Sequence, residues 1–429
     1  MNISTDMIMQ DVVLTCLQTD KFKTSCLSIN LLTALNRESA SKNALTPKVL
    51  HRGTFSLPDM AAISQKLDSL YGARLFPMLR KKGEIQVVGF CSDFADDAFL
   101  PESGGNLEKI AALMGEMLLR PAAKAGVLLE DYVESEKEKL LEKLRGRIND
   151  KRAYALQRLL EQMFSMEDYG TDILGSEQAI ENISAKELTE HYHHLLESSP
   201  IEIFYCGSAA PERVAEILKN ALKELPRSVD EELDLGTDIR MNTLEAQPRY
   251  FEDELQVTQG KLCMGFRLGE CMEEPDTAAI KVFNGVFGGC VTSKLFMNVR
   301  EKLSLCYYAG SSVDLHKGVM IVSSGIEFDK YDDARSEIMA QLEAVKKGDF
   351  TDGELEAAKR SIAGDYRSVC DSPAALEDFY LNQALIGPDC SPEELAGLVE
   401  RVTREQVIDI AKDVELDAVY FLRGAKEKN

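Results

Sequence analysis

The feature that most constrains the fold of this chain is an order of local signals that occurs twice. Ser184-Ala185-Lys186-Glu187 has the form of a helix-capping box, and Thr403-Arg404-Glu405-Gln406 has the same form in the second half. A short apolar run ends at Gly207 in the first half and at Gly424 in the second. The paired signals are offset by 219 and 217 residues. Each signal alone is common, but a shared order at a nearly constant offset indicates an internal duplication.

Strand-like and helix-like patterns follow one another in the same order within each half. The expected strands are Val12–Gln18, Thr24–Leu32, Glu84–Phe90 and Ile201–Cys206, then Lys261–Phe266, Leu305–Gly310, Val319–Ser323 and Val419–Leu422. The expected helices are Leu107–Leu119, Leu128–Arg147 and Pro211–Leu222, then Asp276–Phe287, Asp332–Leu342 and Glu354–Tyr366. Another helix, capped by Ser56 and ended by Gly72, is expected to match Asp276–Phe287. We therefore predict an α+β fold of two homologous domains, each a mainly antiparallel sheet with helices packed on one face.

The length of 429 residues also favours two domains, because a single hydrophobic core rarely grows this large. The expected join is polar and acidic and shows no periodicity. The predicted boundaries are 1–225 for the N-terminal domain, 226–254 for the linker region and 255–429 for the C-terminal domain.

The formal net charge of −23 argues against nucleic acid as a partner, because phosphates require a basic surface. The acidic balance fits either a soluble surface or a basic ligand. No run of eighteen apolar residues and no secretory signal is present, so we expect a cytoplasmic protein without a membrane partner. The ten cysteines are scattered singly, which predicts reduced and mostly buried side chains.

Common catalytic signatures are absent from the sequence. It contains no G-x-S-x-G, no P-loop and no G-x-G-x-x-G that follows a strand. Histidine is scarce, with five residues in all. His191 and His194 are three residues apart on a predicted helix, so they could share a face and hold a metal, although an exposed helix explains them as well.

The stretch from Gly285 to Gly318 carries the sharpest local pattern. Gly288 and Gly289 allow the backbone to bend sharply or to lie close to a neighbour. A helix is then expected to end near Lys302, with a strand after it. Arg300 would lie on the last turn of that helix and Tyr307 on the strand, so a cation and a phenol share one short corner. Helix-dipole and strand preferences alone also account for these two residue types.

Two stretches of the chain, together with the duplication, resemble the pitrilysin/insulinase-type zinc metallopeptidases, which include the mitochondrial processing peptidase and paired bacterial homologues. The first stretch contains Leu50-His51-Arg52-Gly53-Thr54 and Tyr71-Gly72-Ala73, which are similar to the segment after the zinc motif of that family. The second runs from Phe287-Gly288-Gly289 to Leu305-Cys306-Tyr307 and is similar to the C-terminal signature of the family. The resemblance covers nearly the whole chain.

The resemblance places the zinc motif of the family, H-x-x-E-H, on Ala44-Leu45-Thr46-Pro47-Lys48. Every functional residue of that motif is replaced, since alanine offers no ligand atom, proline cannot act as a base and Lys48 is itself a cation. Thr46-Pro47 also has the form of a helix start, which predicts that the helix displaying the motif begins late. A third family ligand would fall on Glu134 or Glu136. We therefore expect no metal and no other cofactor in this chain.

Arg300 and Tyr307 match the pair with which the family holds a substrate carbonyl opposite the zinc. The resemblance thus implies a non-catalytic, peptide-binding subunit of a heterodimeric zinc endopeptidase, whose homologous partner carries the zinc motif, with the Gly288-Gly289 turn near the interface. A homodimer is the alternative for the chain expressed alone. Another reading is a stand-alone peptide-binding or scaffold homologue without proteolysis. An enzyme with an unrecognised metal site, such as His191 and His194, is a third.

Overall fold

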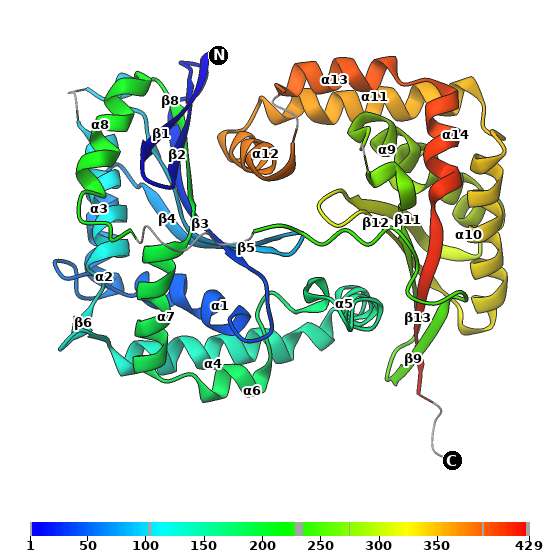
Figure 1. Ribbon diagram of the computed structural model, residues 1–429, viewed down its shortest axis with the longest axis horizontal. Helices are drawn as coiled ribbons and strands as arrows, with labels where there is room; N and C mark the ends of the chain where they lie inside the picture. The colour runs from blue at the N-terminus through cyan, green and yellow to red at the C-terminus, as the bar shows by residue number, and fades with distance from the viewer. Residues whose placement is uncertain (1, 102–103, 228–234, 274, 388–389, 426–429) are drawn as a thin grey trace. The chain divides into compact units, whose positions relative to one another are not determined.

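Figure 1 shows a computed structural model of the chain, which describes residues 2–101, 104–227, 235–273, 275–387 and 390–425. The chain forms two compact units, and each of them is built from three separate segments. Unit 1 comprises Met1–Arg145, Thr171–Gly236 and Asp371–Pro388. Unit 2 comprises Gly146–Gly170, Thr237–Cys370 and Asp389–Asn429. Each unit is described by itself below.

Unit 1 is built on a six-stranded sheet. Its strands are β1 (Asn2–Met9), β2 (Val12–Gln18), β3 (Thr24–Ala34), β4 (Arg74–Lys82), β5 (Ile85–Ala95) and β8 (Ile201–Gly207). They lie in the order β1-β2-β8-β3-β5-β4, and β2 with β8 is the parallel pair among antiparallel neighbours. The central strand β3 is buried along almost its whole length, so it is covered on both faces.

Alternate residues of β3 point to opposite faces of the sheet. Leu27, Ile29 and Leu31 enter the main core, which most of the helices of the unit cover. These helices are α1 (Ala40–Leu50), α2 (Met60–Ser69), α3 (Asn106–Leu119), α4 (Glu130–Gly146), α6 (Glu177–Asn182), α7 (Ala185–Ser198) and α8 (Pro211–Ala221). A small hairpin of β6 (Ala123–Lys124) and β7 (Val127–Leu128) also belongs to this unit.

Unit 2 contains a five-stranded sheet of the same kind. Its strands are β9 (Arg249–Leu255), β10 (Gly260–Arg267), β11 (Cys306–Asp314), β12 (Val319–Ile326) and β13 (Glu415–Gly424). One face is covered by α9 (Thr277–Asn284), α10 (Tyr331–Lys346), α11 (Asp352–Val369), α13 (Pro392–Arg401), α14 (Arg404–Asp413) and two π-helical segments, η5 (Gly285–Gly289) and η6 (Leu295–Lys302).

The two sheets have the same topology. The order β2-β8-β3-β5-β4 of unit 1 corresponds to β9-β13-β10-β12-β11 of unit 2. In each sheet the parallel pair joins an early strand to the last one, namely β2 to β8 and β9 to β13. The duplication and the α+β class predicted from the sequence are therefore confirmed, and β1 is an addition to the first sheet.

Each sheet is covered on its other face by a helix from the opposite half of the sequence. Helix α5 (Lys151–Met163) packs on β10 and β13 of unit 2, where Leu159 and Met163 belong to one buried apolar cluster with Cys263 and Tyr420. Helix α12 (Pro373–Ile386) packs on β3 and β8 of unit 1. The division into 1–225, 226–254 and 255–429 stays a prediction of where the two sequence repeats begin and end. The packed units differ from these repeats, because each sheet is covered by one helix from the other half of the sequence.

A buried network of charges attaches the segment after α5 to the sheet of unit 2. Arg267 is fully buried on β10 and donates to Asp417 at 2.9 Å and to Glu167 at 2.7 Å. Asp417 also accepts from Arg249 at 2.6 Å, and Glu167 also pairs with Lys317 at 2.8 Å. Buried charges are tolerated only when they are paired in this way, so the network fixes which strands and which segment meet.

Three sequence predictions need correction here. Helix α1 begins at Ala40, not at Pro47, because its apolar side chains fill the core and this packing outweighs the backbone hydrogen bond that Pro47 cannot donate. The helix expected after Ser56 is capped by Asp59, and Ser56 instead donates to Glu116. The counterpart of α9 in the first half is α1, since each follows the matching central strand.

The stretch 226–254 also differs from a simple linker. Strand β9 begins inside it at Arg249 and pairs in parallel with β13. It is an edge strand whose exposed alternate residues are Tyr250, Glu252 and Glu254, and this polar pattern did not indicate a strand in the sequence. Residues 228–234 of that stretch lie outside the described part of the chain. Within the described residues, no helix is both long enough and apolar enough to cross a bilayer.

We predict that Asp417→Asn destabilises the protein strongly. The substitution removes a fully buried negative charge from between Arg249 and Arg267, which leaves excess positive charge in the interior. Breaking a buried ion pair in this way costs about 3–5 kcal/mol of unfolding free energy. Urea unfolding measures the change. The control Asp409→Asn, whose exposed carboxylate pairs with Lys412, is expected to stay within about 0.5 kcal/mol of the parent, and equal effects would contradict the prediction.

Candidate functional site

The segment that carries Arg300 and Tyr307 forms the corner that the sequence predicts. Helix η6 ends at Lys302 and strand β11 begins at Cys306. The chain turns between them through Ser304, whose φ of 50° lies in the left-handed region that a non-glycine residue seldom adopts. The turn is held by a hydrogen bond of 3.0 Å from the Leu305 N–H to the carbonyl of Val299. Arg300 and Tyr307 are thus presented by one rigid corner of unit 2.

Tyr307 is exposed and Arg300 is partly exposed, and each has a positioning neighbour. The guanidinium of Arg300 lies 4.6 Å from the centre of the Phe296 ring, and its Nε lies 3.5 Å from Glu301. The phenol of Tyr307, which is 61% exposed, donates a hydrogen bond to Glu327 at the end of β12. That hydrogen bond, followed by the negative charge of Glu327, raises the pKa of Tyr307. The corner therefore offers two polar hydrogen-bond donors to solvent.

Sequence reasoning missed the two neighbours. Phe296 lies four residues before Arg300, a spacing that brings side chains together on a helix, so the sequence contained a weak signal for it. Glu327 follows a different strand, and no local pattern links it to Tyr307. Only the antiparallel pairing of β11 with β12, in which Cys306 lies opposite Ile326, brings them together.

Gly288 is placed where the backbone passes close to β11. A Cβ atom there would lie 2.5 Å from the Ser311 Oγ atom and 2.8 Å from the Ser311 backbone nitrogen. At Gly289 a Cβ atom would lie 2.5 Å from the Asn284 Nδ2 atom. The Ser311 backbone cannot move away easily, so position 288 requires glycine, whereas at position 289 the Asn284 side chain could shift. The prediction of a close backbone approach is confirmed, while the proximity to an interface stays a prediction.

The close approach lies within the π-helical segment η5, and the second π-helical segment, η6, follows it in the chain. A π-helical turn inserts an extra residue into an α-helix and is frequent at functional sites. Asn284, immediately before η5, is joined to β11 by a hydrogen bond of 2.6 Å from Ser311. Strand β11 is also an edge of its sheet, since its one strand neighbour is β12. The unit therefore presents Tyr307 on a sheet edge.

The positions of the lost zinc motif lie on the formed helix α1. Ala44 is fully buried, Pro47 is buried and Lys48 is half-buried. Burial, and then repulsion by Lys143, lowers the pKa of Lys48. None of the three supplies a neutral nitrogen or a carboxylate, so these residues do not fit a zinc ion, although the helix that would carry the motif is present.

The carboxylate that would be the third ligand is neutralised by cations. Glu136 on α4 is only 7% exposed and accepts from Arg52 at 3.2 Å and from Lys139 at 2.6 Å. Glu134, the other candidate, pairs with Lys137 at 2.8 Å. Positive side chains thus occupy the surroundings of Glu136, where the family places a metal.

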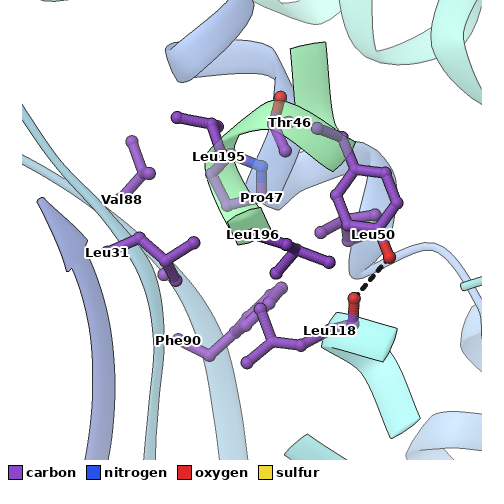
Figure 2. Close-up of a pocket in the computed structure, with 11 residues that line it drawn as sticks. Leu31, Thr46, Pro47, Leu50, Val88, Phe90, Leu118, Leu195 and Leu196 are labelled. Carbon is purple, nitrogen blue, oxygen red and sulfur yellow. Dashed lines mark hydrogen bonds between the residues drawn. The ribbon is translucent and has the colours of Figure 1, made fainter. Parts of the chain in front are cut away.

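The space beside Pro47 is apolar and too small for a substrate. Figure 2 shows side chains from α1, α3, α7 and the sheet that converge on a cavity of about 10 Å³, room for no more than one water molecule. Its lining includes Leu31, Pro47 and Phe90. Tyr192 donates its hydroxyl to the carbonyl of Leu118 at the rim, at 2.5 Å. The lost motif therefore lies against a packed core.

The histidine pair on α7 is not arranged as a metal site. His191 Nε2 lies 2.6 Å from Asn43 Oδ1, so this ring nitrogen is engaged with a neutral amide. Burial, followed by the charges of Lys42 and His194, lowers the pKa of His191 to about 4. Within the described residues, the group of three or more potential metal ligands that lie close together consists of Cys26, Cys91 and Asp93, and neither histidine belongs to it.

Comparison with known proteins agrees with this geometry. The model of the peptidase M16 inactive domain matches residues 182–362. A probable inactive metalloprotease of Bacillus subtilis, YmfF, is 33% identical over 410 residues, which cover 95% of each chain. A conserved protein from Enterococcus faecalis V583 has a solved structure with a TM-score of 0.90, 28% identity and full coverage of both chains. A protease from Helicobacter pylori shares the fold with a TM-score of 0.79 at 14% identity, over 98% of this chain and 99% of that one.

The duplicated fold and the altered motif define a metallopeptidase homologue that lacks its metal ligands. The chain belongs to the M16 family, the pitrilysin/insulinase type of zinc metallopeptidase, as a member of the inactive kind.

We predict that Gly288→Ala separates η5 from β11. The added methyl group would overlap the backbone of Ser311, which cannot move without disturbing the sheet edge. Overpacking of this kind costs about 1–3 kcal/mol of unfolding free energy. The matched control is Gly364→Ala on α11, where a Cβ atom meets nothing within 4 Å and the helix propensity of alanine is expected to stabilise slightly. Denaturant unfolding of both variants measures the change. An unfolding free energy of Gly288→Ala equal to that of the parent would contradict the close approach.

We also predict that His191 makes stability pH-dependent. Its folded pKa of about 4 lies below the ordinary value of 6.5, so the unfolded chain binds the proton more readily in that interval. The contribution of His191 is complete above pH 6.5 and is lost as the pH falls towards 4, by about 3 kcal/mol in total. His191→Gln should remove this slope from urea unfolding measured between those pH values. The exposed His193→Gln should keep it, and equal slopes in all three proteins would contradict the assignment.

Proposed function

We propose that this chain is the non-catalytic, peptide-binding subunit of a heterodimeric zinc endopeptidase. The observation that carries the proposal is a contrast between two places in the chain. The residues at the zinc motif positions do not fit a metal, whereas Arg300 is partly exposed, Tyr307 is exposed, and both lie on one corner and contact neighbouring side chains. A homologous partner with an intact H-x-x-E-H motif supplies the zinc and the base.

The role of the pair follows from its hydrogen-bonding capacity. A guanidinium has five N–H donors, and the ion pair of Arg300 among the described residues is a weak contact of 3.5 Å between its Nε atom and Glu301, so other donors are available to a peptide carbonyl. Tyr307 has one hydroxyl hydrogen, which it now donates to Glu327. On peptide binding the hydroxyl rotates and donates this hydrogen bond to the substrate carbonyl in place of Glu327, and the O–H bond stays intact. Such donors also stabilise the oxyanion that forms when the partner's zinc-bound water attacks.

The position of Tyr307 on a sheet edge supports an extended peptide as the ligand. An edge strand leaves backbone donors and acceptors free to pair with an added strand, and on β11 this applies apart from Ser311, whose carbonyl accepts from Asn284. The backbone of the peptide then provides most of the affinity, and specificity is left to side-chain contacts. This explains why a chain without any catalytic group can contribute to cleavage.

We predict that Arg300→Ala slows peptide cleavage by the heterodimer about 100-fold, mainly in kcat, because a donor to the transition state is lost. Tyr307→Phe removes a single hydrogen bond and should cost about 10-fold. The assay mixes each purified variant with the zinc-bearing homologue that co-purifies from the native cell. Arg401→Ala, an exposed arginine on α13, is the matched control and should be as active as the parent.

The same experiment distinguishes a scaffold protein from a protease subunit. If no zinc-bearing homologue co-purifies, and a fluorescent peptide binds the isolated chain with an affinity that Arg300→Ala reduces, the chain is a stand-alone peptide binder. If cleavage by the heterodimer is unchanged in Arg300→Ala, the assigned role of the pair is wrong. Native mass spectrometry of the isolated chain shows whether it forms a homodimer in the absence of the partner.

A further inference from the structure

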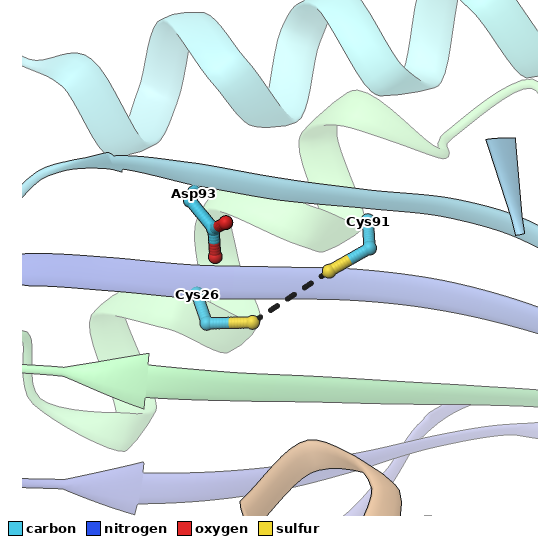
Figure 3. A group of neighbouring side chains, drawn as sticks. All are labelled: Cys26, Cys91 and Asp93. Carbon is cyan, nitrogen blue, oxygen red and sulfur yellow. Dashed lines mark hydrogen bonds between the residues drawn. The ribbon is translucent and has the colours of Figure 1, made fainter. Parts of the chain in front are cut away.

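Unit 1 contains a group of side chains that could hold a metal ion, and none of them belongs to the zinc-motif positions. Cys26 on β3 and the pair Cys91 and Asp93 on β5 place two sulfur atoms and a carboxylate oxygen within 4.8 Å of one another. Figure 3 shows the two thiols pointing towards each other across the neighbouring strands, with Asp93 beside them. We propose that these three residues form a site for a thiophilic divalent cation, Zn²⁺ above all.

The strand register explains why the three side chains share one face. Cys26 pairs with Asp93 across the antiparallel ladder, and Ser28 pairs with Cys91. Side chains alternate along a strand, so Cys91 and Asp93, two residues apart, point to the same side as Cys26. The rigid sheet therefore fixes the relative positions of all three side chains. Metal binding would then cost less conformational entropy.

The spacing of the sulfur atoms fits tetrahedral coordination. Two thiolates bound to zinc at about 2.3 Å, with a tetrahedral angle between them, lie about 3.8 Å apart. The Sγ atoms of Cys26 and Cys91 are 3.7 Å apart in this structure. A disulfide would require about 2.0 Å, and diagonal neighbours on adjacent strands are poorly placed to reach it. A small rotation of the Asp93 side chain supplies the third ligand, and water supplies the fourth.

The charges around the cluster are balanced for a divalent ion. The Oδ2 atom of Asp93 accepts from Arg74 at 2.8 Å, and Oδ1 is left for the metal. An ion pair of this kind orients a ligating carboxylate, as outer partners commonly do in metal sites. Binding of Zn²⁺ releases the two thiol protons, so the ion, two thiolates, the carboxylate and the Arg74 guanidinium sum to zero charge.

The site is enclosed but accessible from one side. Cys26 is fully buried and Cys91 is 3% exposed, which excludes bulky thiol reagents. The side chain of Asp93 is 23% exposed and provides the route for the ion. Soft thiolate ligands favour Zn²⁺ over Mg²⁺ or Ca²⁺. Such an ion would clamp β3 to β5 in the sheet of unit 1.

Cobalt titration of the reduced, metal-free full-length chain tests the proposal. We expect one equivalent of Co²⁺ to give thiolate-to-cobalt charge-transfer absorption, which Zn²⁺ then displaces. Cys26→Ser should abolish the absorption. Asp93→Asn should weaken binding at least 10-fold, because it loses a ligand that is charged.

Cys263→Ser is the matched control, since Cys263 is equally buried on the equivalent strand β10 but lies opposite Ser323 and Tyr420, neither of which is a cysteine. This variant should bind like the parent. Absence of the charge-transfer band in the parent protein, or equal binding by Cys26→Ser, would overturn the proposal. If Cys26→Ser does not fold, the partly exposed Asp93→Asn decides, and an unchanged affinity in that variant would overturn it as well.

Discussion

The structure depends on buried ion pairs that attach one exchanged helix to each sheet. On unit 1, Glu377 of α12 is 1% exposed and binds Arg80 of β4 at 2.6 Å and Asn30 of β3 at 3.0 Å. On unit 2, the buried Arg267 of β10 binds Glu167, in the segment that follows α5, at 2.7 Å. Buried pairs add little net stability, but breaking one is costly, so they mainly exclude wrong arrangements. They specify which sheet each exchanged helix covers in a chain whose two halves share one topology.

Two features keep the zinc-motif positions from fitting a metal ion. The ligands are replaced, and positive side chains lie beside the remaining carboxylate. A buried carboxylate needs a cation nearby, and in this chain Arg52 and Lys139 meet that need at Glu136. The side chains thus balance the buried charge of Glu136 without a metal ion. The donors on the other unit depend on a different constraint, the pairing of β11 with β12, which places Glu327 beside Tyr307. The zinc-motif positions and the corner of Arg300 and Tyr307 can therefore change independently. This is consistent with a subunit that binds a peptide while its partner catalyses the cleavage.

The sequence predicted those parts of the fold that have local signals. Both capping boxes, at Ser184 and Thr403, are formed as expected, and the duplication is seen in the order of the strands. The sequence could not show that α5 and α12 exchange sheets, because the partners of Arg267 and Glu377 are more than a hundred residues away or lie in the other half. Pro47 indicated a helix that begins at that residue, but packing of the helix in the core outweighs this local signal, and the helix begins earlier. For the site, the corner of Arg300 and Tyr307 was predictable from local patterns, whereas Glu327 and the cluster at Cys26 depend on strand register alone.

The central claim, that the chain holds a peptide at the corner of Arg300 and Tyr307, is tested most directly by hydrogen–deuterium exchange. The complex from the native cell would be compared with and without an uncleavable peptide. The account predicts slower amide exchange in residues 305–314, where an added strand would pair with β11, and little change along β4, the corresponding edge of the other sheet. Unchanged exchange in 305–314 with saturating peptide, or protection confined to other segments, would contradict it.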